Sequence, residues 1–268
     1  MTQHTYIYKF LQHFVPKNLY GKGVGKKSSF SRDGEQRGTS AENRCVSEIN
    51  DKSSHETFIL LGPPGSGKST EAKILKRELG LEHIEIGSEL RKAALKETDL
   101  GKLINEIVYQ KKELVPDGIV GRVLNDALQG IETGVLLDGA PRRLSQIDEV
   151  EEILTNHNRK MEKVIYLTLS LEQCVERISR RFLCQNCKAA YKQGKDTEVE
   201  TGICSLCQGE VSQRYDDTPE GVAKRYQVFH DQTIPVINHY KEKGMLVEVS
   251  ADGDPEAIAS DILEAFKK

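Results

Sequence analysis

The stretch LLGPPGSGKST, residues 60–70, decides the fold of this 268-residue chain. It fits the pattern G-x-x-x-x-G-K-[ST], in which glycines let successive backbone N–H groups point at one phosphate. The apolar run at 58–61 predicts a strand before it, and the apolar spacing in 72–79 predicts a helix after it. Because this order of strand, loop and helix is the context in which the pattern binds phosphates, we predict that residues 62–70 hold a nucleotide.

Two side chains of this loop carry predicted roles. Lys68 would reach the outer phosphates of a nucleoside triphosphate, and the hydroxyl of Ser69 would bind Mg²⁺. A glycine-rich turn without a ligand is the alternative, and the intact lysine and hydroxyl argue against it.

Composition excludes several classes of protein. The formal net charge is −3, whereas nucleic-acid-binding domains usually carry a basic excess. The apolar runs are far shorter than the roughly 20 residues needed to cross a bilayer. We therefore expect neither a nucleic-acid partner nor a membrane partner.

Residues 1 to 55 differ from the rest of the chain. The first thirty residues contain five lysines and no Asp or Glu, and a polar tract follows them. We predict a disordered N-terminal extension and a cytoplasmic protein. A targeting peptide leading to an organelle matrix and a partner-binding segment are the alternatives.

Four of the six cysteines form two C-x₂-C pairs separated by sixteen residues. This spacing is typical of a structural zinc site with four sulfur ligands. Reduced, metal-free cysteines and a disulfide or redox pair are the alternatives. The predicted zinc ligands are Cys184, Cys187, Cys204 and Cys207, and we expect no role for Cys45 and Cys174.

Predicted strands and helices alternate along the chain after the phosphate-binding loop. Strands are predicted at 83–86, 135–137, 164–167 and 245–249, with helical patterns between them. Helix starts are indicated by the capping box at Ser170 and by Thr218-Pro219 and Asp254-Pro255. Alternation of this kind predicts an α/β fold with a parallel sheet covered by helices on both faces.

Two inserts interrupt the alternation. Residues 87–132 contain several predicted helices, the last of which opens at Pro116-Asp117. Residues 182–213 carry the paired cysteines and are too few to build an apolar core, so a metal would supply folding energy.

Six sequence blocks together indicate a family. Beside the phosphate-binding loop they are 84–91 (IEIGSELR), 114–117 (LVPD), 137–142 (LDGAPR), 177–181 (RISRR) and 214–217 (RYDD), with Arg225 following. From about Thr57 to the end, the chain resembles adenylate kinases, within the nucleoside monophosphate kinase family, in the long form with a zinc-bearing lid.

The resemblance implies a P-loop three-layer fold with a five-stranded parallel sheet, a helical monophosphate-binding insert and a small zinc-bearing lid. Its implied boundaries are an adenylate kinase-like domain at 56–268, with a core at 56–86, 133–181 and 214–268. The insert is then 87–132 and the lid 182–213. The implied activity is reversible, Mg²⁺-dependent phosphoryl transfer from ATP to AMP, in line and with lid closure, by a monomer.

The resemblance also implies roles for individual residues, mostly arginines, because arginine holds phosphate oxygens bidentately. The implied catalytic residues are Lys68, Asp138, Arg142, Arg177, Arg181, Arg214 and Arg225. The implied ATP-binding residues are Gly65, Ser66, Gly67, Lys68, Ser69, Thr70, Arg177 and Arg181. The implied AMP-binding residues are Ile86, Arg91, Leu114, Val115, Gly139, Arg142, Gln146, Arg214 and Arg225. Asp138 would orient waters around Mg²⁺, while Arg143 and Arg180 are expected to be solvated charges.

Gln146 bears on the acceptor base. In adenylate kinases a glutamine at this spacing reads adenine, whereas UMP/CMP kinases usually carry asparagine there. The alternative is a polar residue on the exposed side of a helix. Departures from the family pattern gather on the acceptor side, at Ile86, Ser88, Ala140 and Arg143.

These departures keep two other functions open. One is a kinase for GMP, UMP or CMP, and the other is a nucleotide-binding regulatory protein with an altered acceptor pocket. Lys188 is a further departure, because it replaces the glycine that commonly follows the second cysteine of a zinc knuckle.

Overall fold

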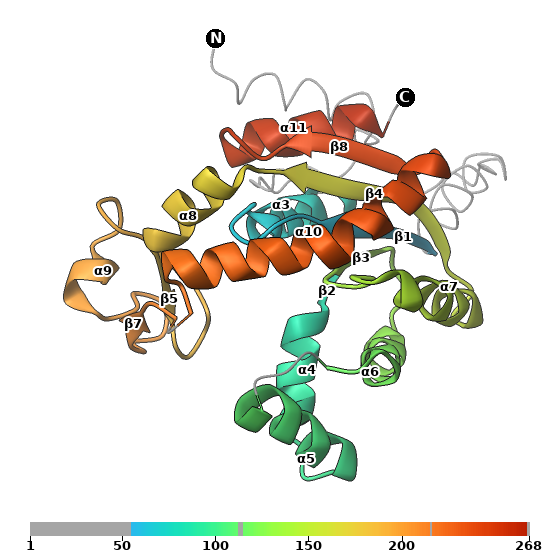
Figure 1. Ribbon diagram of the computed structural model, residues 1–268, viewed down its shortest axis with the longest axis horizontal. Coiled ribbons are helices and arrows are strands. Elements are labelled where there is room, and N and C mark those ends of the chain that lie inside the picture. The colour runs from blue at the N-terminus through green and yellow to red at the C-terminus, as the bar shows by residue number, and fades with distance from the viewer. Residues whose placement is uncertain (1–54, 112–114, 215, 267–268) are drawn as a thin grey trace, which may run out of the picture. The chain divides into compact units, whose positions relative to one another are not determined.

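The computed structural model describes residues 55–111, 115–214 and 216–266, and element labels follow Figure 1. The predictions made for residues 1–54, including Cys45, and for Leu114 lie outside the described residues. In the described part, no helix is both long and apolar enough to cross a membrane.

Five parallel strands form the central sheet, in the order β2-β3-β1-β4-β8. They are β1 (Glu56–Leu61), β2 (Glu82–Glu85), β3 (Val135–Asp138), β4 (Lys160–Thr168) and β8 (Leu246–Ser250). The predicted five-stranded parallel sheet is confirmed. The predicted end of the second strand is wrong by one residue, because the chain turns after Glu85 and Ile86 opens a helix.

Alternate residues of β1 face opposite sides of the sheet, as the two-residue period of a strand requires. Ile59 and Leu61 pack on one face, and Phe58 and Leu60 pack on the other. The first face is covered by α6 (Asp117–Leu128), α7 (Ile147–Asn156) and α10 (Pro219–Glu242). The second is covered by α3 (Lys68–Leu79), α8 (Leu171–Ser179) and α11 (Pro255–Ala265). The result is the predicted three-layer arrangement (Figure 1).

The predicted helix starts are confirmed by their capping bonds. The hydroxyl of Ser170 accepts from the N–H of Gln173 in a capping box, and that of Thr218 accepts from the N–H of Gly221. The carboxylate of Asp254 accepts from the N–H of Glu256. These caps satisfy helix N–H groups that would otherwise lack partners.

The segment between β2 and β3 is helical. It contains α4 (Ile86–Ala94), α5 (Asp99–Asn105), the π-helix η1 (Glu106–Lys111) and α6, which begins at Asp117 as predicted. Ala94, Ile104 and Val123 form a small apolar cluster that joins α4 and α5 to α6. The short 3₁₀ turn η2 (Leu144–Gln146) follows β3 and leads into α7.

The cysteine-bearing segment forms a second, antiparallel sheet with the order β6-β5-β7. Its elements are β5 (Arg181–Cys184), β6 (Ala190–Lys192), α9 (Glu198–Thr201) and β7 (Val211–Ser212). Its buried core consists of Cys184, Cys204 and Val211 with a few partly buried neighbours. We refer to residues 182–213 as the lid.

Candidate active site and metal centre

The phosphate-binding loop lies between the end of β1 and the start of α3. Gly65 and Gly67 have φ angles of 82° and 85°, in the left-handed region that favours glycine. A Cβ on Gly65 would also lie 3.1 Å from a side-chain carbon of Ile178. These two positions therefore require glycine, and Gly67 caps α3 so that its first N–H groups face the loop.

Lys68 folds over the loop that precedes it. Its ammonium group donates to the backbone carbonyls of Gly62 at 2.7 Å and Pro63 at 3.0 Å. Burial lowers the pKa of Lys68 to about 8, although the carboxylate of Asp138 opposes this effect. The two carbonyls thus hold the ammonium group over the loop, while Ser69 and Thr70 are exposed beside it.

Asp138 ends β3 at the carboxyl edge of the sheet, in register with Leu60 of β1. It is only 3% exposed. Nε2 of His83 lies 3.8 Å from its Oδ2, and this nitrogen has no hydrogen-bond partner among the described residues. A buried carboxylate next to Lys68 agrees with the predicted position of Asp138, whereas His83 was not singled out from the sequence.

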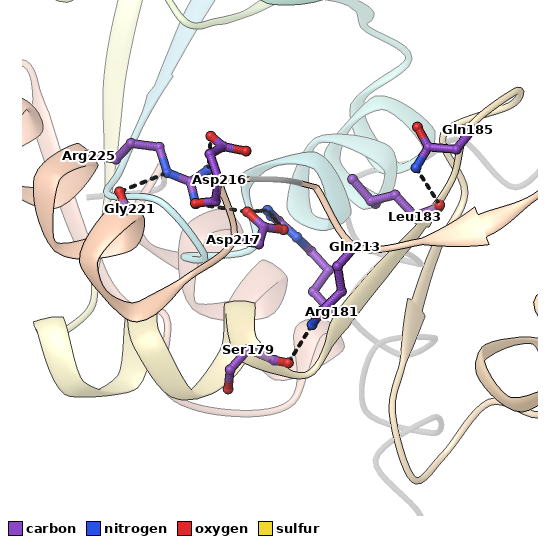
Figure 2. Close-up of polar contacts among 9 residues, drawn as sticks. All are labelled: Ser179, Arg181, Leu183, Gln185, Gln213, Asp216, Asp217, Gly221 and Arg225. Atoms are coloured by element: carbon purple, nitrogen blue, oxygen red, sulfur yellow. Dashed lines mark hydrogen bonds and ion pairs between the residues drawn. The ribbon is translucent and has the colours of Figure 1, made fainter.

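One buried carboxylate holds two of the predicted catalytic arginines, as Figure 2 shows. A guanidinium nitrogen of Arg181 donates to both oxygens of Asp217, at 2.9 and 3.0 Å, and Arg225 donates to one of them at 2.8 Å. Arg225 also donates to the backbone carbonyl of Asp216 at 3.0 Å. The Asp217 side chain is 1% exposed, so a buried carboxylate anchors both arginines.

Asp217 lies in the block 214–217, but the sequence predicted no role for it. The available signal was an aspartate pair flanked by two of the expected arginines. Nε of Arg181 is buried without a hydrogen-bond partner among the described residues, and an incoming anion would supply one.

The two connections of the lid lie beside this carboxylate (Figure 2). Arg181 is the first residue of β5, and the side-chain amide of Gln213 donates to the carbonyl of Ser179 at 2.6 Å across the two connections. Gln185 likewise donates to the hydroxyl of Ser212 at 2.8 Å inside the lid. The lid therefore joins the core where the arginines are held.

Other positive charges converge on the same region. Burial lowers the pKa of Arg214, and the like charges of Arg181 and Arg91 lower it further. The positive charges of Arg142 and Arg181 likewise lower the pKa of Lys68. This excess of positive charge favours binding of an anion with several negative charges.

Arg177 makes its polar contacts with the loop after β8. It donates to the carbonyl of Ala251 at 2.8 Å and lies 3.6 Å from the carboxylate of Asp252. The structure thus gives Arg177 a partner in the loop after β8.

Gln146, on the predicted acceptor side, is buried and its amide makes two hydrogen bonds. It is 4% exposed; its Oε1 accepts from the backbone N–H of Arg142 at 2.6 Å, and its Nε2 donates to Asp117 at 2.8 Å. The alternative of an exposed polar residue on a helix is therefore wrong. Ile86 and Ala140 are 2% and 0% exposed, and both pack in the apolar cluster between the sheet and helices α6, α7 and α10.

Three other predicted acceptor residues lie in the described part of the chain. Val115 is 8% exposed and packs in the same core. Gly139 has a φ of 94°, and its carbonyl accepts from Nε of Arg142 at 3.0 Å. Arg91 on α4 lies 3.4 Å from the carboxylate of Glu85 and is 40% exposed.

The expectation that Arg143 is a solvated charge is wrong. Its guanidinium donates to the carbonyl of Val115 at 3.0 Å and pairs with Asp117 at 3.0 Å, because the start of α6 packs against the loop after β3. The expectation for Arg180 is confirmed. Arg180 is 55% exposed and is paired only loosely with Glu176, at 3.5 Å.

The four lid cysteines come together as a candidate metal centre. Their sulfur atoms all lie within 4.8 Å of one another, with Cys184 and Cys207 3.4 Å apart and Cys187 and Cys204 3.6 Å apart. A tetrahedron with Zn–S bonds of about 2.3 Å has edges of about 3.8 Å. The cluster therefore fits a metal ion, and its sulfur separations exceed the roughly 2.05 Å of a disulfide.

Neighbouring residues adapt the lid to these sulfurs. The hydroxyl of Tyr191 lies 3.0 Å from the sulfur of Cys204, and this hydrogen bond lowers the pKa of the thiol, which favours the thiolate that binds metals. A Cβ on Gly209 would lie 3.0 Å from the sulfur of Cys184. Lys188 has a φ of 60°, as expected where glycine is common.

Cys174 is buried outside the cluster, and burial raises its pKa to about 11.

Comparison with known proteins agrees with this geometry. The family model described as adenylate kinase matches residues 60–245. An adenylate kinase of Archaeoglobus fulgidus is 39% identical over 213 residues, which cover 79% of this chain and 98% of the relative. An adenylate kinase of Dehalococcoides mccartyi is 38% identical over 211 residues, covering 78% of this chain and 97% of the relative. The phosphate-binding loop, the converging arginines and these matches together show that the chain belongs to the adenylate kinase family.

Proposed function

We propose that this chain catalyses the reversible transfer of the γ-phosphoryl group of ATP to AMP, giving two molecules of ADP. Membership of the adenylate kinase family supports this activity, and it favours neither of the other two functions considered above. The observation that carries the proposal is the convergence of Lys68, Arg142, Arg181, Arg214 and Arg225, all cationic, around a phosphate-binding loop. Such a site neutralises the phosphates of two nucleotides at once.

The residues suggest a direct transfer. An α-phosphate oxygen of AMP attacks the γ-phosphorus of ATP as the bond to the β–γ bridging oxygen breaks and ADP leaves. Arg91 and Arg142 would hold the acceptor phosphate, and Lys68 would hold the donor phosphates. Arg181, Arg214 and Arg225 would neutralise the charge that spreads over the transferring group.

Mg²⁺ bound with ATP would offset the negative charge of the phosphates. Ser69 offers an exposed hydroxyl for it, and Asp138 offers a buried carboxylate close to Lys68. We propose that the lid (182–213) closes over ATP and excludes water. Arg181 supports this proposal, because it starts the strand that leads into the lid and is anchored by Asp217 beside the arginines of the site. The insert (87–132) would bind AMP, with the core at 56–86, 133–181 and 214–268.

We propose zinc as the metal of the cysteine cluster, with a structural role. Four sulfur ligands at tetrahedral separations suit zinc. Because the lid buries few apolar residues, metal binding would supply part of its folding free energy. A monomeric state and a cytoplasmic location remain predictions from the sequence.

Transfer is tested with ATP labelled at the γ-phosphorus, AMP, Mg²⁺ and the purified chain. We expect label in the β-phosphate of ADP only when AMP is present, together with little free phosphate. Lys68→Met serves as an inactive control. Release of labelled inorganic phosphate without labelled ADP would contradict the proposal.

A further inference from the structure

Asp117 is a point of contact between the insert and the loop after β3. As the first residue of α6, it accepts hydrogen bonds from Ser145 at 2.6 Å and Gln146 at 2.8 Å, and it pairs with Arg143 at 3.0 Å. None of these contacts was expected from the sequence. Three neighbouring residues of one loop thus bind one carboxylate on another element.

These contacts fix the orientation of the Gln146 side chain. An amide presents an oxygen that accepts and an –NH₂ that donates, and a half-turn of the amide exchanges them. At Gln146 one side faces the N–H of Arg142, which only donates, and the other faces the carboxylate of Asp117, which only accepts when ionised. Because a flipped amide would oppose donor to donor and acceptor to acceptor, one orientation is allowed.

The allowed orientation leaves one N–H and one lone pair of Gln146 uncommitted. The Watson–Crick edge of adenine presents an acceptor at N1 beside a donor at N6, whereas that of guanine presents a donor at N1 beside an acceptor at O6. An amide that rotates freely matches either edge. An amide held in one orientation matches only one.

We propose that Asp117 is a specificity-determining residue, which selects adenine over guanine by fixing the amide of Gln146. The inference rests on the proposed function, because it takes AMP as the acceptor and Gln146 as the residue that reads its base. Arg143 and Ser145 are positioning residues for Asp117. The guanidinium of Arg143 pairs with this carboxylate, and its bond to the carbonyl of Val115 ties the same guanidinium to the insert.

Asp117→Asn tests the proposal directly. Asparagine can offer Gln146 either its oxygen or its –NH₂, so the residue at position 117 no longer opposes the flipped amide, and only the N–H of Arg142 still does. We expect the ratio of kcat/KM for AMP to that for GMP to fall about tenfold or more. The change should lie mainly in the KM values of the two acceptors, with the KM for ATP unchanged. Asp126→Asn, which alters an exposed aspartate on the same helix, is the matched control.

A double-mutant cycle separates amide fixation from general loosening of the insert. In a Gln146→Ala background, Asp117→Asn should leave the AMP-to-GMP ratio unchanged, because no amide remains to be fixed. An equal fall in the ratio with and without Gln146 would overturn the proposal, as would an unchanged ratio in the single variant. If the unaltered chain shows no preference for AMP, the proposed function itself fails.

Ser145→Ala provides a second variant in case Asp117→Asn does not fold. It removes one hydrogen bond to Asp117 from an exposed residue. We expect a smaller fall in the ratio, about two- to threefold, in the same direction. A ratio equal to that of the unaltered chain would count against Asp117 as the selecting residue.

Discussion

On the proposed donor side of the active site, where the phosphoryl group would be transferred, a single buried carboxylate, Asp217, holds two arginines, and backbone carbonyls of its own loop hold Lys68. On the acceptor side, the carboxylate of Asp117 holds a neutral amide, Gln146, together with Arg143. Both carboxylates organise their surroundings before substrate binds. Asp217 positions two positively charged side chains. Asp117, by our proposal, determines which side of the Gln146 amide donates a hydrogen bond and which side accepts one.

This difference matters because the two substrates pose different problems. The phosphates of ATP require positive charge in the right place, and charge acts over several ångströms. A base is distinguished by the direction of hydrogen bonds, which depends on how one side chain is turned. We therefore expect changes on the donor side to alter rates and changes on the acceptor side to alter base selectivity.

Loss of the loop lysine should give the largest effect. Lys68→Met removes the cation that lies over the phosphate-binding loop, and we expect kcat/KM to fall by about 10³-fold or more. Steady-state rates with saturating AMP measure this loss. Lys73→Met, an exposed lysine on the same helix, should retain nearly full activity. A Lys68 variant with more than a tenth of the original rate would break the donor side of the comparison.

Loss of the shared carboxylate should come next. Asp217→Asn leaves Arg181 and Arg225 without their common counter-charge, so we expect kcat to fall by about 10²-fold with the AMP-to-GMP ratio unchanged. Asp231→Asn, at an exposed position 59% accessible on α10, is the control. A shift in the base ratio comparable to that of Asp117→Asn would mean that the two sides are not separable.

The sequence was enough to predict much of the fold and of the donor side. Alternating apolar runs, helix caps and the glycines of residues 62–67 each act locally, so the sheet, the helix starts and the position of Lys68 follow from short stretches. The contacts of Arg143 could not be found in this way. They depend on α6 packing against a loop 28 residues away in sequence, as does the bond between Ser145 and Asp117.

A third prediction concerns the stability of the helix that follows the phosphate-binding loop. Burial raises the pKa of Glu71, with help from Glu256 and Asp254, from 4.5 to about 7, and its Oε2 has no hydrogen-bond partner among the described residues. The folded state therefore binds a proton more tightly than the unfolded chain. Stability should fall as pH rises from about 4.5 to 7, by roughly 3 kcal/mol.

Glu71→Gln removes this cost. Urea unfolding should show the variant more stable by roughly 2–3 kcal/mol at pH 8, with the advantage vanishing near pH 4.5. Glu176→Gln, at a position 63% exposed, should change neither value. An equal gain at both pH values would show that titration of Glu71 is not the cause.

Metal removal should have the smallest effect on the core. Chelation should lower the melting temperature by a few degrees, because the lid has few buried apolar residues of its own. Cys204→Ser should reproduce this shift and no longer respond to the chelator, whereas Cys174→Ser keeps the four cluster cysteines and should still respond. The AMP-to-GMP ratio at low temperature should stay constant. An unchanged melting temperature after confirmed metal loss would contradict the structural role.

If this family member phosphorylates AMP and its acceptor side selects adenine, kcat/KM should depend strongly on the base of the acceptor. The most direct test measures kcat/KM for AMP, GMP, CMP and UMP with ATP and Mg²⁺ under one set of conditions. We predict that AMP exceeds each of the others by about 10²-fold or more, with two ADP formed for each AMP consumed. A preference for guanine or a pyrimidine, or ATP hydrolysis without transfer to any acceptor, would contradict the account.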